Sequence, residues 1–87
     1  MIDIEHNARR FITEFSNETD ELLAEYDLAS FDLKLFQIEF AEGDASDPMY
    51  YCYPIKEENI AFLKKYLSEE LDWDFVNKAY FVEAEEA

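Results

Sequence analysis

The sequence has very few of the residues on which disulfide-rich proteins and most enzymes depend. Its 87 residues include one cysteine, one histidine, one glycine and two prolines. The lone Cys52 excludes an internal disulfide, and we expect it to be a buried structural thiol in a reducing compartment. The lone Gly43 excludes a glycine-rich phosphate-binding loop. The lone His6 lies before the expected domain, so a Ser-His-Asp or Cys-His arrangement has no supported base.

Long apolar runs and metal-binding motifs are missing as well. No apolar stretch approaches the ~20 residues that span a bilayer, and no apolar segment follows a basic start as in a secretory signal. We therefore expect a cytoplasmic protein. Zinc would need His and Cys ligands that the chain lacks, and calcium loops starting at Asp44 or Asp72 lack the glycine of an EF-hand. The sequence thus predicts no metal, no cofactor and no catalytic residue.

Positive charge is also scarce. Seven Lys and Arg stand against 22 Asp and Glu, which gives a formal net charge of −15. An acidic chain without aromatic residues would be disordered. This chain has 8 Phe, 6 Tyr and 1 Trp and is 49% hydrophobic, so a core can form with the charge outside it. Such a surface repels nucleic acid and anionic membranes and attracts cationic partners.

The first half of the chain predicts a hairpin and a helix. Residues 9–15 and 22–26 alternate at period two across about five turn-forming residues, which indicates a β-hairpin, with a helix as the alternative for the second segment. For residues 31–41 a helix is favoured over a strand, because Ser30 is a good N-cap and the loop containing Gly43 ends the segment.

The second half predicts a strand, a helix and a final strand. Residues 49–53 are aromatic-rich and lie between two prolines, which indicates a buried strand. Residues 56–68 have apolar side chains at helical spacing, and residues 79–84 read as a strand. The expected fold is a small α+β domain of order β-β-α-β-α-β, a mostly antiparallel sheet with two helices on one face. We expect this single domain at 9–84, a mobile N-terminus at 1–8 and a frayed acidic C-terminus at 85–87.

Acidic residues gather in the hairpin and after each of the two predicted helices. Any single cluster is typical of a solvated surface, but solubility asks only for a net charge of magnitude about 2–8. The excess favours steering of a basic protein partner, for which exposed Tyr and Trp are frequent anchors. The predicted partner-binding residues are Glu42, Asp44, Asp47, Tyr50, Asp72, Trp73 and Asp74.

Five short motifs, spread over most of residues 9–84, carry a family resemblance. They are Arg10-Phe11-Ile12-x-Glu14-Phe15, Glu21-Leu22-Leu23-x-Glu25-Tyr26, Asp47-Pro48-Met49-Tyr50, Tyr53-Pro54-Ile55 and Tyr80-Phe81-Val82-Glu83. The pattern resembles the small immunity proteins of bacterial contact-dependent growth inhibition and similar polymorphic toxin systems. The resemblance implies a cytoplasmic antidote that binds and blocks a cognate toxin domain, often a basic nuclease. Its motifs are mainly structural, so they carry over no contact residues.

Two other functions fit the same sequence. A nucleic-acid mimic would inhibit a DNA- or RNA-binding protein and would compete with generic DNA for several unrelated binders. A non-catalytic adaptor would use its acidity only to stay soluble, and it would form no saturable complex with cationic proteins.

Overall fold

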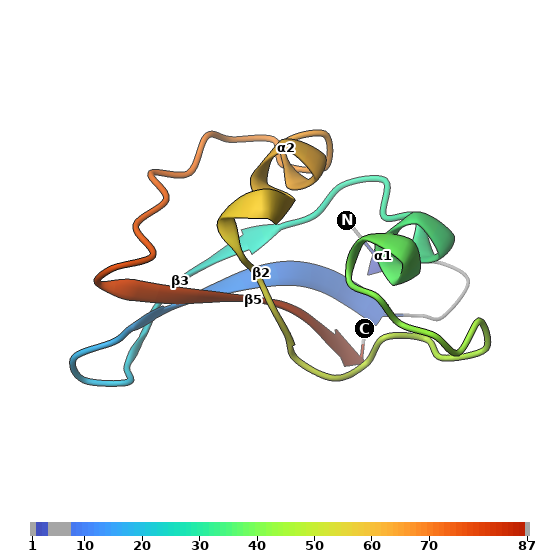
Figure 1. Ribbon diagram of the computed structural model, residues 1–87, viewed down its shortest axis with the longest axis horizontal. Coiled ribbons are helices and arrows are strands. Elements are labelled where there is room, and N and C mark those ends of the chain that lie inside the picture. Colours follow the sequence, from blue (N-terminus) through green and yellow to red (C-terminus); the bar gives the residue numbers. More distant parts are fainter. Residues whose placement is uncertain (1, 4–7, 87) are drawn as a thin grey trace.

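The computed structural model describes residues 2–3 and 8–86 and has one β-sheet with both helices on the same face (Figure 1). Its elements are β1 (Ile2–Asp3), β2 (Ala8–Ser16), β3 (Leu22–Asp27), α1 (Leu33–Glu39), β4 (Tyr53–Pro54), the 3-10 turn η1 (Glu57–Asn59), α2 (Ile60–Leu63) and β5 (Lys78–Glu86). The predicted α+β fold is confirmed. No helix in the part of the chain described is long and apolar enough to cross a membrane.

The sheet is built around β2. On one side β2 pairs with β5 along its whole length, from Ala8 opposite Glu86 to Ser16 opposite Lys78. On its other side β2 pairs with β1 and with β3, and β4 adds two residues to the far edge of β5. All these pairings are antiparallel, and the predicted hairpin is β2–β3. Residues 1 and 4–7 of the expected mobile N-terminus lie outside the described residues.

The hydrophobic core lies between the sheet and the two helices. Ile12 of β2 and Val82 of β5 are fully buried on the face that packs against Phe36 of α1 and Leu63 of α2. This is expected because side chains alternate between the two faces of a strand, whereas a helix buries a stripe at spacings of three and four. The core uses large aromatic side chains, which compensate for the short chain.

The start of α1 differs from the prediction by two residues. Asp32, not Ser30, is the N-cap, since its carboxylate accepts a hydrogen bond from the Leu35 N–H at 3.3 Å. Ser30 has a φ of 57° and is exposed, so it belongs to the preceding turn. An N-cap needs extended backbone, which Asp32 has with φ −114° and ψ 102°.

The end of α1 also differs, because Gly43 does not terminate it. The Ala41 N–H donates to the Ile38 carbonyl at 3.3 Å, and the Glu42 N–H donates to the Gln37 carbonyl at 2.8 Å. This pair of bonds is a Schellman motif, and Ala41 occupies its left-handed position with φ 56°. Gly43 lies beyond the motif and has no positive φ.

These two positions give a matched prediction. Ala41→Gly should raise the free energy of unfolding by about 1 kcal/mol, because a left-handed conformation costs an L-residue ~1–2 kcal/mol. Gly43→Ala should raise it by about 0.5 kcal/mol, because a Cβ there meets nothing within 4 Å and alanine restricts the unfolded chain. Urea denaturation measures both changes. A less stable Ala41→Gly variant would contradict the Schellman assignment.

The predicted buried strand at residues 49–53 is wrong over most of its length. Only Tyr53 belongs to β4, while Tyr50 and Tyr51 are 49% and 77% exposed. Cys52 is exposed as well, so the expectation of a buried thiol is wrong. The cause is Met49, whose φ of 56° interrupts the alternation that a strand requires.

The second predicted helix, at residues 56–68, is shorter than its periodicity indicates. Helical backbone covers η1 and α2 only. Beyond α2, the Tyr66 carbonyl accepts from the Ala29 N–H at 2.8 Å, and Leu67 forms an isolated bridge with Leu28. The chain therefore leaves the helix to extend the edge of the sheet beyond β3. The final strand is confirmed and is longer than predicted.

Candidate functional site

The predicted partner-binding residues fall into two groups at opposite ends of the longest axis, which measures 35 Å (Figure 1). Glu42, Asp44, Asp47 and Tyr50 lie in the loop after α1, here called the 42–50 loop. Asp72, Trp73 and Asp74 lie between α2 and β5, here called the 72–74 segment. The structure does not bring the two groups into one surface.

The carboxylates of the 42–50 loop shape the loop itself. Glu42 accepts from the Asp44 N–H at 3.2 Å, and Asp47 accepts from the Met49 N–H at 2.7 Å. Asp44 accepts from both the hydroxyl and the N–H of Ser46, and these bonds lower the pKa of the Asp44 carboxyl. The Asp44 carboxyl is therefore ionised at neutral pH, and several oxygens of the three acids already have donors from the chain.

Two further contacts hold this loop against the domain. Partial burial and the hydrogen bond to Glu42 raise the pKa of Tyr53 to about 12, so its hydroxyl remains a donor to Glu42 at 3.1 Å. Gln37 of α1 donates to the carbonyls of Ala45 and Asp47 at 3.2 and 2.7 Å. Hydrogen bonds therefore attach the loop to the domain at Glu42, Ala45 and Asp47.

Tyr50 is half exposed but also has a structural contact. The buried Arg10 guanidinium lies 5.3 Å from the centre of the Tyr50 ring and 4.4 Å from that of Phe31. Cation–π contacts of this kind stabilise a desolvated arginine. Tyr50 thus covers Arg10 with part of its ring and leaves the rest accessible to a partner.

In the 72–74 segment, the three residues differ in role. Trp73 is half-buried, since its ring stacks on Phe75 at 5.8 Å and packs on Tyr80 at 4.8 Å. Asp74 accepts from the Val76 N–H at 3.1 Å and from the side chain and N–H of Asn77, which lowers the pKa of its carboxyl. Within the described chain, the exposed Asp72 carboxylate has no hydrogen bond or ion pair.

Sequence reasoning identified the acidic cluster of the hairpin but missed the apolar surface beside it, at the tip of the β2–β3 hairpin. Leu22 and Leu23 are each 50% exposed there, and Val76 from the turn before β5 is 84% exposed. We call these three residues, with Glu18, Asp20 and Glu21 of the hairpin turn, the hairpin-end surface. Two adjacent leucines in one strand cannot both face the core, and this was the available signal. The sequence gave no sign that Val76, far along the chain, would line the same hollow as Leu23.

A second missed feature is the Arg9 cluster on the face of the sheet opposite the helices. Arg9 forms ion pairs with Glu25, Asp27 and Glu85 at 3.0, 2.7 and 3.1 Å. Its guanidinium lies 4.2 Å from the centre of the Phe11 ring and helps to bury it. The cluster therefore neutralises part of the acidic surface and acts as a cover over Phe11.

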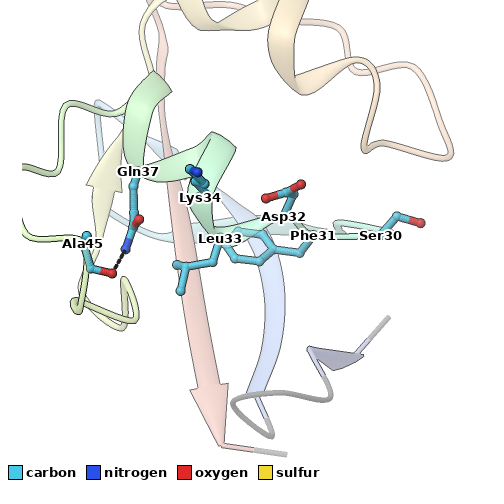
Figure 2. Close-up of a pocket in the computed structure, with 7 residues that line it drawn as sticks. All are labelled: Ser30, Phe31, Asp32, Leu33, Lys34, Gln37 and Ala45. Atoms are coloured by element: carbon cyan, nitrogen blue, oxygen red, sulfur yellow. Dashed lines mark hydrogen bonds between the residues drawn. The ribbon is translucent and has the colours of Figure 1, made fainter.

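A hollow of about 620 Å³ lies at the start of α1 (Figure 2). It is lined by Ser30, Phe31, Asp32, Leu33, Lys34, Gln37 and Ala45. Figure 2 shows Ser30 and Asp32 pointing away from each other, and the Asp32 carboxylate caps the helix. Ser30 and Asp32 therefore form no nucleophile–base pair in this hollow.

Cysteine and metal chemistry have no assembled site in the described residues. The Cys52 thiol has its pKa raised by partial desolvation and then by the neighbouring Glu83 carboxylate. A thiol with a raised pKa carries little thiolate and is a weak nucleophile. No three His, Cys, Asp or Glu side chains between residues 8 and 86 gather in a way that could hold a metal ion.

Comparison with known proteins identifies one family. A family model described as a domain of unknown function (DUF7683) matches residues 9–83, which is nearly the whole of the folded domain. No curated protein and no solved structure matches the chain.

Proposed function

The chain belongs to the DUF7683 family of domains of unknown function, and we propose that it is an immunity protein that binds and neutralises a cognate toxin domain through an acidic surface. The partner is a basic protein, and a nuclease domain fits best because nucleases bind phosphates with lysine and arginine. The chain itself acts by binding and carries out no chemistry. The sequence motifs quoted above support this proposal by their resemblance to immunity proteins.

The observation that carries the proposal is acidic charge that the chain does not neutralise. The ion pairs between described residues involve two cations, Arg9 and Lys78, against a formal net charge of −15. This self-repulsion destabilises the free protein, and a cationic partner relieves it. A charge of this size also raises the association rate with a basic protein by ~10–10³.

Exposed apolar side chains beside the acids add to the support. Tyr50 ends the 42–50 loop, Tyr51 follows it, and Val76 follows the 72–74 segment; all three are at least 49% exposed. Interfaces combine such anchors with a charged rim, because the anchors supply affinity and the rim supplies orientation and rate. We place the action of the protein in the cytoplasm, where an exposed free thiol such as Cys52 stays reduced.

The test is a calorimetric titration of this chain with the protein encoded immediately upstream of its gene. We expect a saturable 1:1 complex whose Kd rises at least about tenfold between 0.05 and 0.5 M NaCl, because salt screens the attraction. Co-expression should also protect cells from the upstream protein. Unrelated nucleases serve as the control and should not bind.

Other results would point elsewhere. Binding to several unrelated DNA-binding proteins, in competition with generic DNA, would identify a nucleic-acid mimic. The absence of any saturable complex with cationic proteins would identify an adaptor module, and the immunity proposal would then fail. Binding that ignores salt would contradict the electrostatic mechanism.

A further inference from the structure

The hairpin-end surface is formed by two turns that lie about sixty positions apart in the chain. The Asn17 N–H donates to the Asn77 carbonyl at 2.9 Å, and the Asn17 side chain donates to the Val76 carbonyl at 3.2 Å. In Figure 1 the hairpin turn and the start of β5 lie at the same end of the molecule. Tertiary structure thus places Val76 at the end of the hairpin, where it lines the same hollow as Leu23.

Both turns are held rigidly. The Ser16 hydroxyl accepts from the N–H groups of Glu18 and Thr19 at 3.1 and 3.2 Å. The turn that carries Val76 is fixed by the Asp74 carboxylate, which accepts from the N–H groups of Val76 and Asn77. A partner that binds here would lose little conformational entropy, since the surface is already ordered.

The apolar side chains at this end have no structural explanation. A tight turn favours Gly, Asn, Asp or Ser, yet this one presents a valine that is 84% exposed. Leu23 is the extra residue at the irregularity where the β2–β3 register shifts between Glu14 and Phe15. Leu23 and Val76 line one hollow of about 610 Å³. Exposed apolar side chains that gather in one hollow are typical of a binding surface.

The charge around the hollow selects the kind of partner. Glu18 and Glu21 line it, and Asp20 lies between them at the tip of the turn. In the described part of the chain none of these three acids forms an ion pair, and Lys78, which also lines the hollow, is paired with Glu14 at 3.6 Å. The rim of the hollow therefore complements lysine and arginine. A second copy of this chain would set the same carboxylates against one another, which opposes self-association.

We propose that the hairpin-end surface is the docking site for the basic partner, with Leu23 and Val76 as apolar anchors and Glu18, Asp20 and Glu21 as the charged rim. This inference rests on the proposed function and names the surface that carries it out. It gives Asp74 the part of a positioning residue, since it shapes the turn that presents Val76. The 42–50 loop is left outside the contact.

The test measures binding of the protein encoded upstream to matched variants. Leu23→Ser combined with Val76→Ser should weaken binding at least about thirtyfold, the effect of removing a hot spot. The control, Leu35→Ser combined with Ile38→Ser, removes side chains that are 45% and 70% exposed outside the hollow and should change Kd less than about twofold. Circular dichroism and urea denaturation confirm that each variant is folded.

A second measurement needs no substitution. Amide chemical shifts of the labelled wild-type chain, recorded with and without the upstream protein, should change most at residues 17–23 and 74–78. Changes centred on residues 42–50, or equal losses in both double variants, would overturn the surface assignment while leaving the proposed function standing. Failure of the wild-type chain to bind would instead overturn the proposed function. A dimer in sedimentation that the Leu23/Val76 variant abolishes would assign the surface to self-association and overturn the inference.

Discussion

Phe36→Ala is expected to lower the free energy of unfolding by about 3–5 kcal/mol. Phe36 is fully buried, and its ring centre lies 4.3 Å from that of Phe31, 4.9 Å from that of Phe62 and 4.8 Å from that of Tyr66. The substitution opens a cavity at the point where α1, α2 and the segment before α1 meet. Domains of this size have a total stability of roughly 4–13 kcal/mol, so a large part of it would be lost.

Urea denaturation at fixed salt measures this loss, and a second variant separates volume from shape. Phe36→Leu keeps much of the side-chain volume and should cost less than about half as much as the alanine variant. An alanine variant within about 1 kcal/mol of the wild type would show that α1 is loosely attached, in conflict with the aromatic cluster described above.

Arg10→Ala is expected to lower the free energy of unfolding by about 3 kcal/mol. Arg10 is fully buried, and its Nη1 donates to the Met49 carbonyl at 2.7 Å. Its guanidinium also lies against the rings of Phe31 and Tyr50. The substitution leaves a buried carbonyl without its donor, at a cost of ~1–3 kcal/mol, and removes cation–π contacts of up to about 2 kcal/mol.

The matched variant for this position is Arg10→Met. Methionine fills most of the same space and removes the cost of burying a charge, so this variant should recover part of the stability lost with alanine. Both variants are measured by urea denaturation, and near-ultraviolet circular dichroism reports the packing of Tyr50. Equal stability of the wild type and the alanine variant would contradict a structural role for Arg10.

Local sequence pattern predicted those strands and helices whose tertiary contacts favour the same secondary structure. The period-two alternation of residues 9–15 and 22–26 yielded β2 and β3, because Phe11 of β2 is buried under Arg9 on the face opposite the helices and Tyr26 of β3 packs against the core. The helix at α1 was predicted from an N-cap at Ser30 and a stop at the loop containing Gly43, and the segment is helical although Asp32 and Ala41 take those two roles. Here local propensity and tertiary packing favour the same structure, so the prediction was confirmed.

The errors share a cause, which is a contact distant in sequence. The helix expected at 56–68 ends early because Tyr66 and Leu67 bond to Ala29 and Leu28 at the edge of the sheet. The strand expected at 49–53 is interrupted at Met49, where a positive φ buries the side chain and leaves the carbonyl facing Arg10. Neither contact can be recognised from the residues next to it in the sequence, so the local pattern could not predict where the helix ends or the strand is interrupted.

The predicted site residues were chosen by charge and residue type, and charge does not distinguish a binding carboxylate from one that holds a turn. Asp44, Asp47 and Asp74 all accept hydrogen bonds from backbone N–H groups within two or three residues. Asp side chains commonly stabilise turns in this way, by accepting hydrogen bonds from backbone N–H groups two or three residues further along. Only the folded structure shows that Asp72 differs from these acids, because its exposed carboxylate accepts no such hydrogen bond from a described residue.

The sequence by itself determined that this is a small, strongly acidic α+β domain whose charge must lie outside an aromatic core. Hydrophobic periodicity and net charge are local or additive properties, so they can be read without the fold. Tertiary structure decided which carboxylates form hydrogen bonds or ion pairs within the chain. It also decided where exposed apolar side chains meet. It brought Val76 to Leu23 through the bonds of Asn17. A surface assembled from two distant turns depends on strand pairing, which no single segment encodes.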